Sequence, residues 1–293
     1  MSKQAKKALC GAWEGIALAA PLVIGCGLFY GVPFGMVLQN SFQRGTGSAR
    51  QYVGLETYQN MLRSGVFRLA LGNTVRFLAV ALPLNILLAY AIALGLKSHA
   101  KRHEILKSVL LLPYMMPVAG TVLLVELLFA QTGLFNKALA AFGLPVADWL
   151  HSGAAFWVVV ALYLWKNTGY SVILLLSGLI TIPEEQYAAA SLDGATAWQQ
   201  FRHITSPQMW YSVFFATVFS LLNAFKCFRE IFLIGGTHPD KSIYMLQHFV
   251  NNAFDKMNEP KLAVASVLLS AVLIVLFVLG YRWVLRKEAY KNA

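Results

Sequence analysis

The sequence YAAASLDGATAWQQFRHITSP, residues 187–207, separates two long apolar runs of the chain. It is polar and rich in alanine, and a single glycine, Gly194, breaks it. Such a segment indicates a loop outside a membrane if the runs on either side are long enough to cross one. The fold therefore depends on the length and composition of those runs.

Two short helices are predicted within residues 183–207. The segment Pro183-Glu184-Glu185 is typical of a helix start, because proline suits the first turn and acidic side chains stabilise the N-terminal end. We expect the first helix to run from Gln186 to Leu192 and to end at Asp193-Gly194, since glycine adopts the turn at a helix end without strain. A second short helix is expected from Ala195 to His203.

These helices would form a compact knob, for which two roles are open. Small alanine side chains allow another protein to approach closely, and Trp198, Phe201 and Ile204 offer an apolar face. The knob could instead lie on lipid headgroups as an ordinary interfacial loop. The physical properties of the residues do not decide between the two.

The composition of the 293-residue chain indicates a protein surrounded mostly by lipid. Hydrophobic residues make up 58% of it and charged residues 13%, whereas soluble chains carry roughly 25% charged residues. Six stretches are long enough for a membrane-spanning helix, which takes about 20 residues. They lie near residues 14–38, 70–96, 108–131, 154–179, 208–234 and 262–283. We therefore predict an all-α integral membrane protein in which residues 1–293 form one transmembrane domain.

Several prolines fall within or beside the first three predicted spans. Neighbouring helices can satisfy the backbone groups that proline frees, so these residues do not exclude spans. They are Pro21, Pro33, Pro83, Pro113 and Pro117.

The positions of lysine and arginine predict the orientation of the spans. Of the 24 cations, 12 lie near span ends on one side and 8 lie on the other. Because cytoplasmic loops are enriched in these residues, both termini and residues 180–207 are expected to be cytoplasmic. The cations on that side are Lys3, Lys6, Lys7, Lys97, Lys101, Arg102, Lys107, Arg202, Arg282, Arg286, Lys287 and Lys291.

Other classes of function have little support in the sequence. The net charge of +11 is mostly a topology signal, and no basic surface interleaved with aromatic residues indicates nucleic-acid binding. The cysteines Cys10, Cys26 and Cys227 lie in or beside apolar runs without metal or disulfide spacing, so no metal site is expected. No catalytic pair is visible in a span, and no Gly-x-x-x-x-Gly-Lys-Ser/Thr loop is present to bind ATP.

Residues 188–207 resemble the coupling loop of ABC importer permeases. That signature runs Glu-Ala-Ala, three residues, Gly, nine residues, Ile, one residue and Leu-Pro. The chain departs from it twice, with Ala188 in place of Glu and Ser206 in place of Leu. The residues in register are Ala189, Ala190, Gly194, Ile204 and Pro207.

Further segments resemble the carbohydrate branch of that family, the maltose-type permeases. The resemblance covers about residues 17–282, and the order and spacing of the segments carry it. Within the loop they are Leu-Asp-Gly-Ala and Trp-Gln-Gln-Phe. Elsewhere they are Tyr52-Val53-Gly54-Leu55, Leu112-Pro113-Tyr114 with Pro117, Gly133-Leu134-Phe135-Asn136 and Phe228-Arg229-Glu230-Ile231.

This resemblance implies the type I importer-permease architecture in a bacterial or archaeal inner membrane. It implies a second, similar permease, an external solute-binding protein that delivers a sugar, and two ATPase subunits that dock onto the coupling loops. ATP and Mg²⁺ would be used by those subunits, and this chain itself would bind no cofactor. Glu184 or Glu185 is a candidate to replace the contact of the missing Glu at position 188. The residues expected at the ATPase contact are Glu185, Ala188, Ala189, Ala190, Asp193, Gly194, Ala195, Ile204 and Pro207.

A substrate path is predicted from polar residues inside the spans. Ionisable side chains in a membrane usually face a cavity or a partner, and Arg76, Glu126, Lys166, Lys226, Arg229 and Glu230 lie in or near spans. Aromatic and amide groups beside Lys166 suit sugar binding, and a polar stripe follows one face of the fifth span. In maltose-type permeases these regions border the sugar site. The candidates are Tyr163, Trp165, Lys166, Asn167, Tyr170, Ser220, Asn223, Cys227 and Glu230.

Several alternatives remain open at this point. Trp165 and Tyr170 could pack between helices, and Lys166 could pair with Glu230, with Glu126, with a carboxylate of the second permease or with an anionic substrate. The cargo could be a neutral sugar, glycerol phosphate or an anionic glycan, and the two lysines argue against a polyamine. A membrane scaffold or intramembrane enzyme without transport activity is the alternative from another class.

Overall fold

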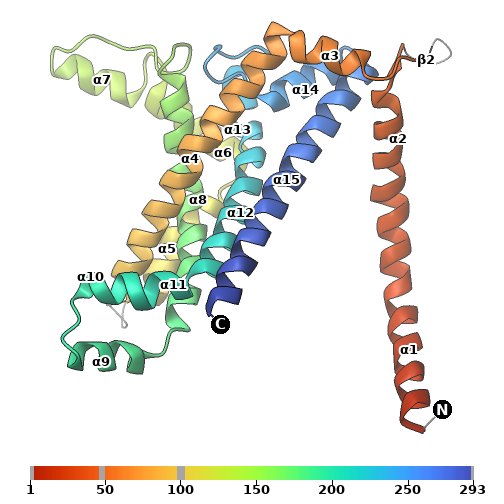
Figure 1. Cartoon of the computed structure of the whole chain (residues 1–293). Helices are drawn as coiled ribbons and strands as arrows, with labels where there is room; N and C mark the ends of the chain where they lie inside the picture. Colours follow the sequence, from red (N-terminus) through yellow and green to blue (C-terminus); the bar gives the residue numbers. More distant parts are fainter. Residues whose placement is uncertain (1–2, 46–49, 98–102, 292–293) are drawn as a thin grey trace. The chain divides into compact units, whose positions relative to one another are not determined.

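The computed structural model describes residues 3–45, 50–97 and 103–291; its regular structure there consists of helices and one pair of short strands, joined by loops (Figure 1). Lys101 and Arg102, two of the predicted cytoplasmic cations, lie outside the described residues. Six helical stretches in this part of the chain are long and apolar enough to cross a membrane, which confirms the predicted number. They are Gly15–Ser41, Gly65–Lys97, Val118–Ala141, Ala155–Ile180, Trp210–Gly235 and Glu259–Arg282.

The chain divides into two compact units, and the first comprises Met1–Ser64 and Ala253–Val272. It contains α1 (Lys3–Cys26), a π-helical turn η1 (Gly27–Gly31), α2 (Val32–Ser41), β1 (Gln43–Arg44), β2 (Gln51–Tyr52), α3 (Glu56–Arg63) and the beginning of α15 (Glu259–Lys291). The two strands are antiparallel. Tyr58 Oη lies 2.6 Å from Ser41 Oγ, and Arg50 forms an ion pair with Glu259 at 2.5 Å. The first contact joins α3 to the end of α2, and the second joins the segment before β2 to the start of α15.

The second unit comprises Gly65–Asn252 and Leu273–Ala293. Its long helices are α4 (Gly65–Lys97), α8 (Ala155–Ile180) and α12 (Trp210–Lys226), which α13 (Phe228–Gly235) follows after Cys227. Its shorter elements are α5 (His103–Met115), α6 (Val118–Phe129), α7 (Leu134–Ala141), α9 (Glu184–Leu192), α10 (Ala197–Gln200), the π-helical turn η4 (Phe201–Thr205), α11 (Ser206–Gln208) and most of α14 (Leu246–Asp255).

Helix α8 is the centre of the second unit and packs against α4, α5 and α12. Buried residues of α4 recur every three or four positions, so one face of that helix meets α8. Many of them are small, including Ala81, Ala89 and Ala93. Small side chains at such contacts let membrane helices approach closely, which supplies packing where no hydrophobic driving force exists between helix and lipid.

One glycine sets the distance between α5 and α8. A Cβ atom added to Gly169 would stand 1.8 Å from the carbonyl oxygen of Leu110, far inside van der Waals contact. The backbone of α5 therefore occupies the space that any side chain at position 169 would need.

The predicted third span, residues 108–131, is not one continuous helix. Helix α5 ends at Met115, Pro117 has an extended backbone with φ −63° and ψ 150°, and α6 begins at Val118. A proline disfavours the helical conformation of the residue before it and provides no N–H, so the chain turns at this point. Pro83, by contrast, lies inside the unbroken helix α4.

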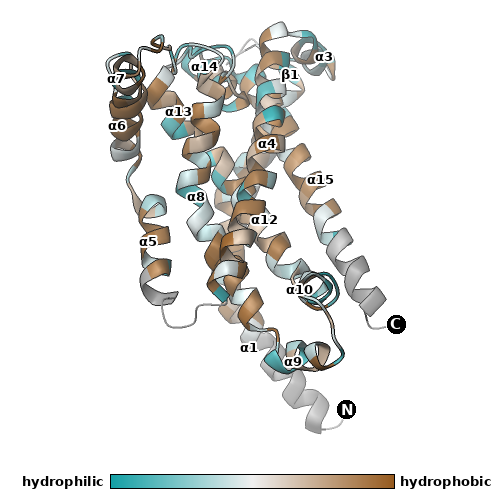
Figure 2. Cartoon of the chain, turned by 90° about the vertical axis from the view of Figure 1, so that its left-hand side faces the viewer, coloured by the Kyte–Doolittle hydropathy of each residue, from teal (hydrophilic) through white to brown (hydrophobic). Residues whose placement is uncertain are grey.

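Shorter elements lie at the two ends of the bundle in the second unit. Helices α9 and α10 follow one end of α8, whereas α7 and the loop after it precede the other end (Figure 1). Apolar residues dominate α4 and α12, while hydrophilic residues gather in α9 and α10 (Figure 2). Helix α7 is itself mostly apolar and belongs to the stretch Val118–Ala141, so the water-facing end of the bundle that stands out is the one at α9 and α10.

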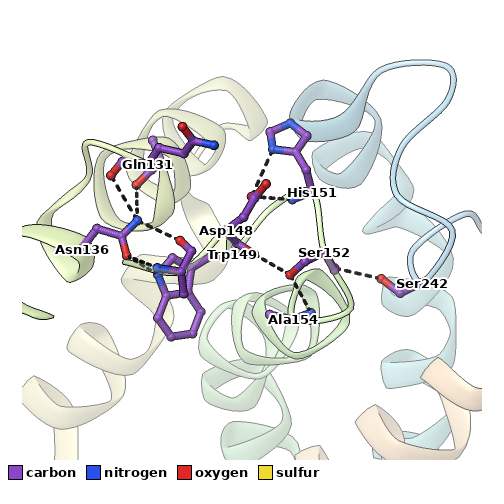
Figure 3. Close-up of polar contacts among 10 residues, drawn as sticks. Gln131, Asn136, Asp148, Trp149, His151, Ser152, Ala154 and Ser242 are labelled. Atoms are coloured by element: carbon purple, nitrogen blue, oxygen red, sulfur yellow. Dashed lines mark hydrogen bonds and ion pairs between the residues drawn. The ribbon is translucent and has the colours of Figure 1, made fainter. Parts of the chain in front are cut away.

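The loop between α7 and α8 is organised by Asn136, a residue of the Gly-Leu-Phe-Asn motif (Figure 3). Its Oδ1 accepts hydrogen bonds from the Trp149 indole at 3.0 Å and the Ala147 N–H at 3.2 Å, and its Nδ2 donates to the Ala147 carbonyl at 2.9 Å. Further along the loop, the backbone N–H of His151 lowers the pKa of the Asp148 carboxyl. Asn136 is thus a structural residue of this loop.

Candidate functional site

The loop of residues 183–207 has the predicted helix–bend–helix form. Helix α9 begins after Pro183, with Glu184 and Glu185 in its first turn. It begins two residues before the predicted Gln186 and ends at Leu192, as predicted; Gly194 beyond it has a φ of +78°, in the left-handed region that favours glycine. The N–H of Ala195 bonds the Ala190 carbonyl at 2.9 Å, and the N–H of Gly194 bonds the Ser191 carbonyl at 3.1 Å. These two bonds satisfy carbonyls at the helix end as a Schellman motif does.

The second helical segment starts slightly later and runs further than predicted. Thr196 is its N-cap, and its side chain and that of Gln199 bond reciprocally to backbone N–H groups in a capping box. The Thr-x-x-Gln pattern in the sequence is the signal that could have located this start. Helical backbone then continues through η4 and α11 to Gln208, past the predicted end at His203.

The loop is fixed to α4 by aromatic contacts. The Lys97 ammonium lies 3.9 Å from the centroid of the Tyr187 ring, and the Tyr187 hydroxyl lies 2.8 Å from Thr205 Oγ1. Tyr90 of α4 makes an edge-to-face contact with Phe201, with ring centroids 5.8 Å apart. Movement of the loop is therefore tied mechanically to α4.

This packing buries part of the predicted apolar face of the loop and leaves the rest exposed. Trp198 remains 66% exposed, but Phe201 and Ile204 are half-buried against the bundle. Ala190 and Ala195 are also half-buried. The remaining residues expected at an ATPase contact are exposed: Glu185, Ala188, Ala189, Asp193, Gly194 and Pro207.

A cavity of about 250 Å³ lies among α5, α6, α8, α12 and α13. It combines amides, charged side chains and an apolar wall. Its lining residues are Tyr114, Val118, Leu162, Tyr163, Lys166, Asn167, Asn223, Lys226, Cys227, Arg229 and Glu230.

Most of the predicted substrate-path residues meet at this cavity. Six of the nine line it: Tyr163, Lys166, Asn167, Asn223, Cys227 and Glu230. The structure also selects one partner for Lys166 from those left open, because its ammonium lies 2.5 Å from Glu230 Oε1. Both side chains are nearly buried, at 14% and 6% exposed.

The other three candidates do not line the cavity. Trp165 is 41% exposed and faces away from it. Tyr170 stacks on Tyr114 with ring centroids 4.8 Å apart, so it supports a lining residue from behind. Ser220 is buried and accepts a hydrogen bond from Asn85 Nδ2 at 2.9 Å.

Sequence reasoning missed three aromatic and apolar contributors, Tyr114, Val118 and Leu162. The first two flank the break at Pro117 between α5 and α6. The prolines of the third span were the signal for this change of direction. Lys226 and Arg229 stood out as intramembrane cations, and the structure places both in the lining.

Ser220 belongs to a buried polar network that joins three helices. Asn85 of α4 donates to Ser171 Oγ of α8 at 2.8 Å as well as to Ser220 Oγ of α12. Thr168 donates to Asn85 Oδ1 at 3.0 Å, and the Tyr163 hydroxyl donates to the Ser220 carbonyl at 2.7 Å. Such bonds between membrane helices hold the wall of the cavity in register.

Comparison with known proteins identifies related membrane permeases. Residues 85–289 match the family of binding-protein-dependent transport system inner membrane components. A probable ABC transporter permease protein of Bacillus subtilis is 32% identical over 262 residues, which are 86% of this chain and 89% of the relative. The trehalose/maltose transport system permease protein of Thermococcus litoralis is 28% identical over 79% of each chain.

The fold also matches a solved structure, that of a bacterial ABC transporter involved in the import of the acidic polysaccharide alginate. The TM-score is 0.81 at 20% identity, and the match covers 97% of this chain and 99% of the other. The residues matched by the family cover most of the second unit, including the loop of residues 183–207 and every lining residue of the cavity. The chain therefore belongs to the family of binding-protein-dependent transport system inner membrane components, the multi-pass permease subunits of ABC importers.

Proposed function

We propose that this chain forms the translocation path of an ATP-driven importer for a sugar or oligosaccharide. The observation that carries the proposal is the naming of its relatives, which are permeases for trehalose or maltose, for arabinooligosaccharides and for lactose, at 26–29% identity. The cavity supports it, since amide groups beside an aromatic ring suit a ligand with hydroxyls and apolar C–H surfaces.

The loop of residues 183–207 would connect the path to its source of energy. In this proposal two ATPase subunits, each using ATP and Mg²⁺, serve a pair of similar permeases, and one subunit binds the exposed surface of α9 and the bend at Gly194. An extracytoplasmic binding protein would deliver the sugar to the opposite end, in a bacterial or archaeal inner membrane with both termini cytoplasmic. The contacts of Tyr187 and Phe201 with α4 would carry ATPase movement into the spans.

Transport of glycerol phosphate by the same path is the second candidate for the cargo. The observation that favours it is the presence of three cations, Lys166, Lys226 and Arg229, in the lining. A scaffold without transport activity has no comparable support from the relatives.

Co-purification of the ATPase with the tagged chain tests the docking role of the loop. In Gly194→Trp a large side chain replaces an exposed residue that has no atom within 4 Å of its added Cβ position. The matched control is Gly143→Trp, at a glycine with φ +70° and equally open space in the loop after α7. Both variants carry the same backbone strain, so only the location differs.

We expect the ATPase to be retained by wild type and Gly143→Trp and lost from Gly194→Trp. A second variant, Gly194→Asn, tolerates the left-handed turn and should retain the ATPase. Failure of any ATPase to co-purify with the wild-type chain and its partner permease would contradict the proposed function.

A further inference from the structure

The cavity has more positive charge than its own residues neutralise. Glu230 is its one carboxylate, and Lys166 already pairs with it at 2.5 Å. Lys226 and Arg229 are exposed lining residues without an ionic partner among residues 3–45, 50–97 and 103–291. A cation in a membrane span is costly to insert and usually faces a cavity or a partner, which favours a function for both.

A buried amide in the same wall also lacks a partner. Asn223 is 8% exposed, lines the cavity and has no side-chain hydrogen bond within the described part of the chain. Its amide atoms are not among the fully buried unpaired atoms of the described residues, so they are open to the cavity and free to bind a ligand. Asn223 lies one helical turn before Lys226 and Cys227, so its amide and the Lys226 ammonium can reach the same ligand.

The opposite wall is apolar and rigid. Tyr114 stacks on Tyr170 with the rings inclined by only 13°, and Tyr170 in turn makes an edge-to-face contact with Phe219. Leu162 and Tyr163 extend this wall. An aromatic ring held in this way offers a flat face to the C–H surface of a sugar ring.

We infer that the cavity is a subsite for an acidic sugar, with the carboxylate at Lys226 and Arg229, a hydroxyl at Asn223 and the ring against Tyr114. This inference rests on the proposed function and specifies its substrate class. A neutral sugar would satisfy the amide and the aromatic ring but would leave two cations unpaired. A small phosphate ester would satisfy the cations but would leave the aromatic wall without a ring to contact.

Direct binding to the assembled complex in lipid nanodiscs tests the inference. The external binding protein is omitted, so that its own selectivity does not decide the result. Isothermal titration calorimetry would compare trigalacturonate, maltotriose and glycerol 3-phosphate. The variants are Lys226→Gln, Arg229→Gln and Asn223→Leu, and the matched control is Lys137→Gln, an exposed cation of α7 outside the cavity.

We expect trigalacturonate to bind more tightly than maltotriose and to weaken as salt is raised. Loss of either cation should reduce trigalacturonate affinity by about tenfold, equivalent to about 1.4 kcal/mol, and should leave maltotriose binding unchanged. Asn223→Leu should weaken the binding of both trisaccharides, and Lys137→Gln should change neither.

Equal affinity for the two trisaccharides that neither cation variant alters would overturn the inference. So would binding of glycerol 3-phosphate in place of trigalacturonate, or loss of the second permease from the Lys226→Gln complex, since the cation would then pair with that subunit. Each of these outcomes leaves ATPase co-purification intact, whereas failure of the proposed function removes the ATPase from the wild-type complex as well.

Discussion

Removing only one partner of the ion pair between Lys166 and Glu230 is expected to destabilise the protein strongly. Lys166 Nζ lies 2.5 Å from Glu230 Oε1, and the two side chains are 14% and 6% exposed. The other carboxylate oxygen, Glu230 Oε2, has no hydrogen-bond partner among the described residues. Lys166→Met would leave the carboxylate buried and unpaired. Breaking a buried pair in this way costs about 3–5 kcal/mol.

The double variant Lys166→Met/Glu230→Leu should recover most of that loss. Replacing both charges by apolar groups removes the desolvation penalty together with the attraction, so such replacements are often close to neutral. At roughly 2–4 °C per kcal/mol, the single variant should lower the melting temperature by roughly 6–20 °C, and the double variant by much less.

Thermal unfolding of the purified chain in detergent, followed by tryptophan fluorescence, would measure both shifts. Lys137→Met, at an exposed position of α7, is the control for loss of a lysine as such. An unchanged melting temperature for Lys166→Met would refute the reasoning. A double variant that loses as much as the two single variants together would refute it equally, because the two residues would then act independently.

Three further predictions follow from the packing of the second unit. Burial lowers the pKa of His248 from 6.5 to about 4, so as the pH falls the unfolded chain takes up a proton before the folded chain does. The free energy of unfolding should be highest above pH 6.5 and fall by up to about 3 kcal/mol toward pH 4. Denaturation of His248→Phe over the same range should not show this loss of stability with falling pH. Gly169→Ala should destabilise by about 1–3 kcal/mol in thermal unfolding, because its methyl group meets the Leu110 carbonyl, whereas Gly72→Ala in α4 has open space and should not. Asn85→Leu should lower thermal stability by about 1–3 kcal/mol, as its three hydrogen bonds join three helices; an unchanged melting temperature would show that the network carries no stability.

Long-range patterns in the sequence were sufficient to predict the number of spans and the bend in the coupling-type loop. An apolar run of the required length forms a spanning helix because a helix satisfies all of its backbone hydrogen bonds within the segment, which lipid cannot do. A glycine after an alanine-rich helix marks the end of that helix. Gly194 accordingly has φ +78° at the end of α9.

The sequence did not predict local details that depend on contacts between residues far apart in the chain. Five prolines looked equivalent in the sequence, yet Pro83 lies within a continuous helix and Pro117 separates two helices. Whether a proline kinks or ends a helix depends on the neighbours that satisfy its freed carbonyls, and those neighbours are distant in the sequence. Tyr114 lies just before the break at Pro117 and lines the cavity, which the sequence alone did not indicate.

The sequence also did not decide which group pairs with Lys166 or which way Trp165 points, because both depend on residues that are distant in the sequence. The choice among Glu230, Glu126 and an external carboxylate requires the packing of α8 against α13, which no pattern within one helix specifies. Helical spacing predicted one polar stripe on the fifth span, formed by Ser220, Asn223, Ala224, Cys227 and Glu230. Three of these residues, Asn223, Cys227 and Glu230, line the cavity, whereas Ser220 and Ala224 are buried outside its lining. Trp165 is adjacent to Lys166 in the chain but lies on another face of α8, where it is 41% exposed.

We propose that this permease couples an ATPase to solute delivered by a binding protein. The most direct test is ATP hydrolysis by the complete complex in proteoliposomes, measured with and without the sugar-loaded binding protein. We predict that the loaded binding protein stimulates hydrolysis for wild type and Gly194→Asn and that Gly194→Trp abolishes the stimulation. Hydrolysis that does not respond to the binding protein, or that responds equally in all three proteins, would contradict the account.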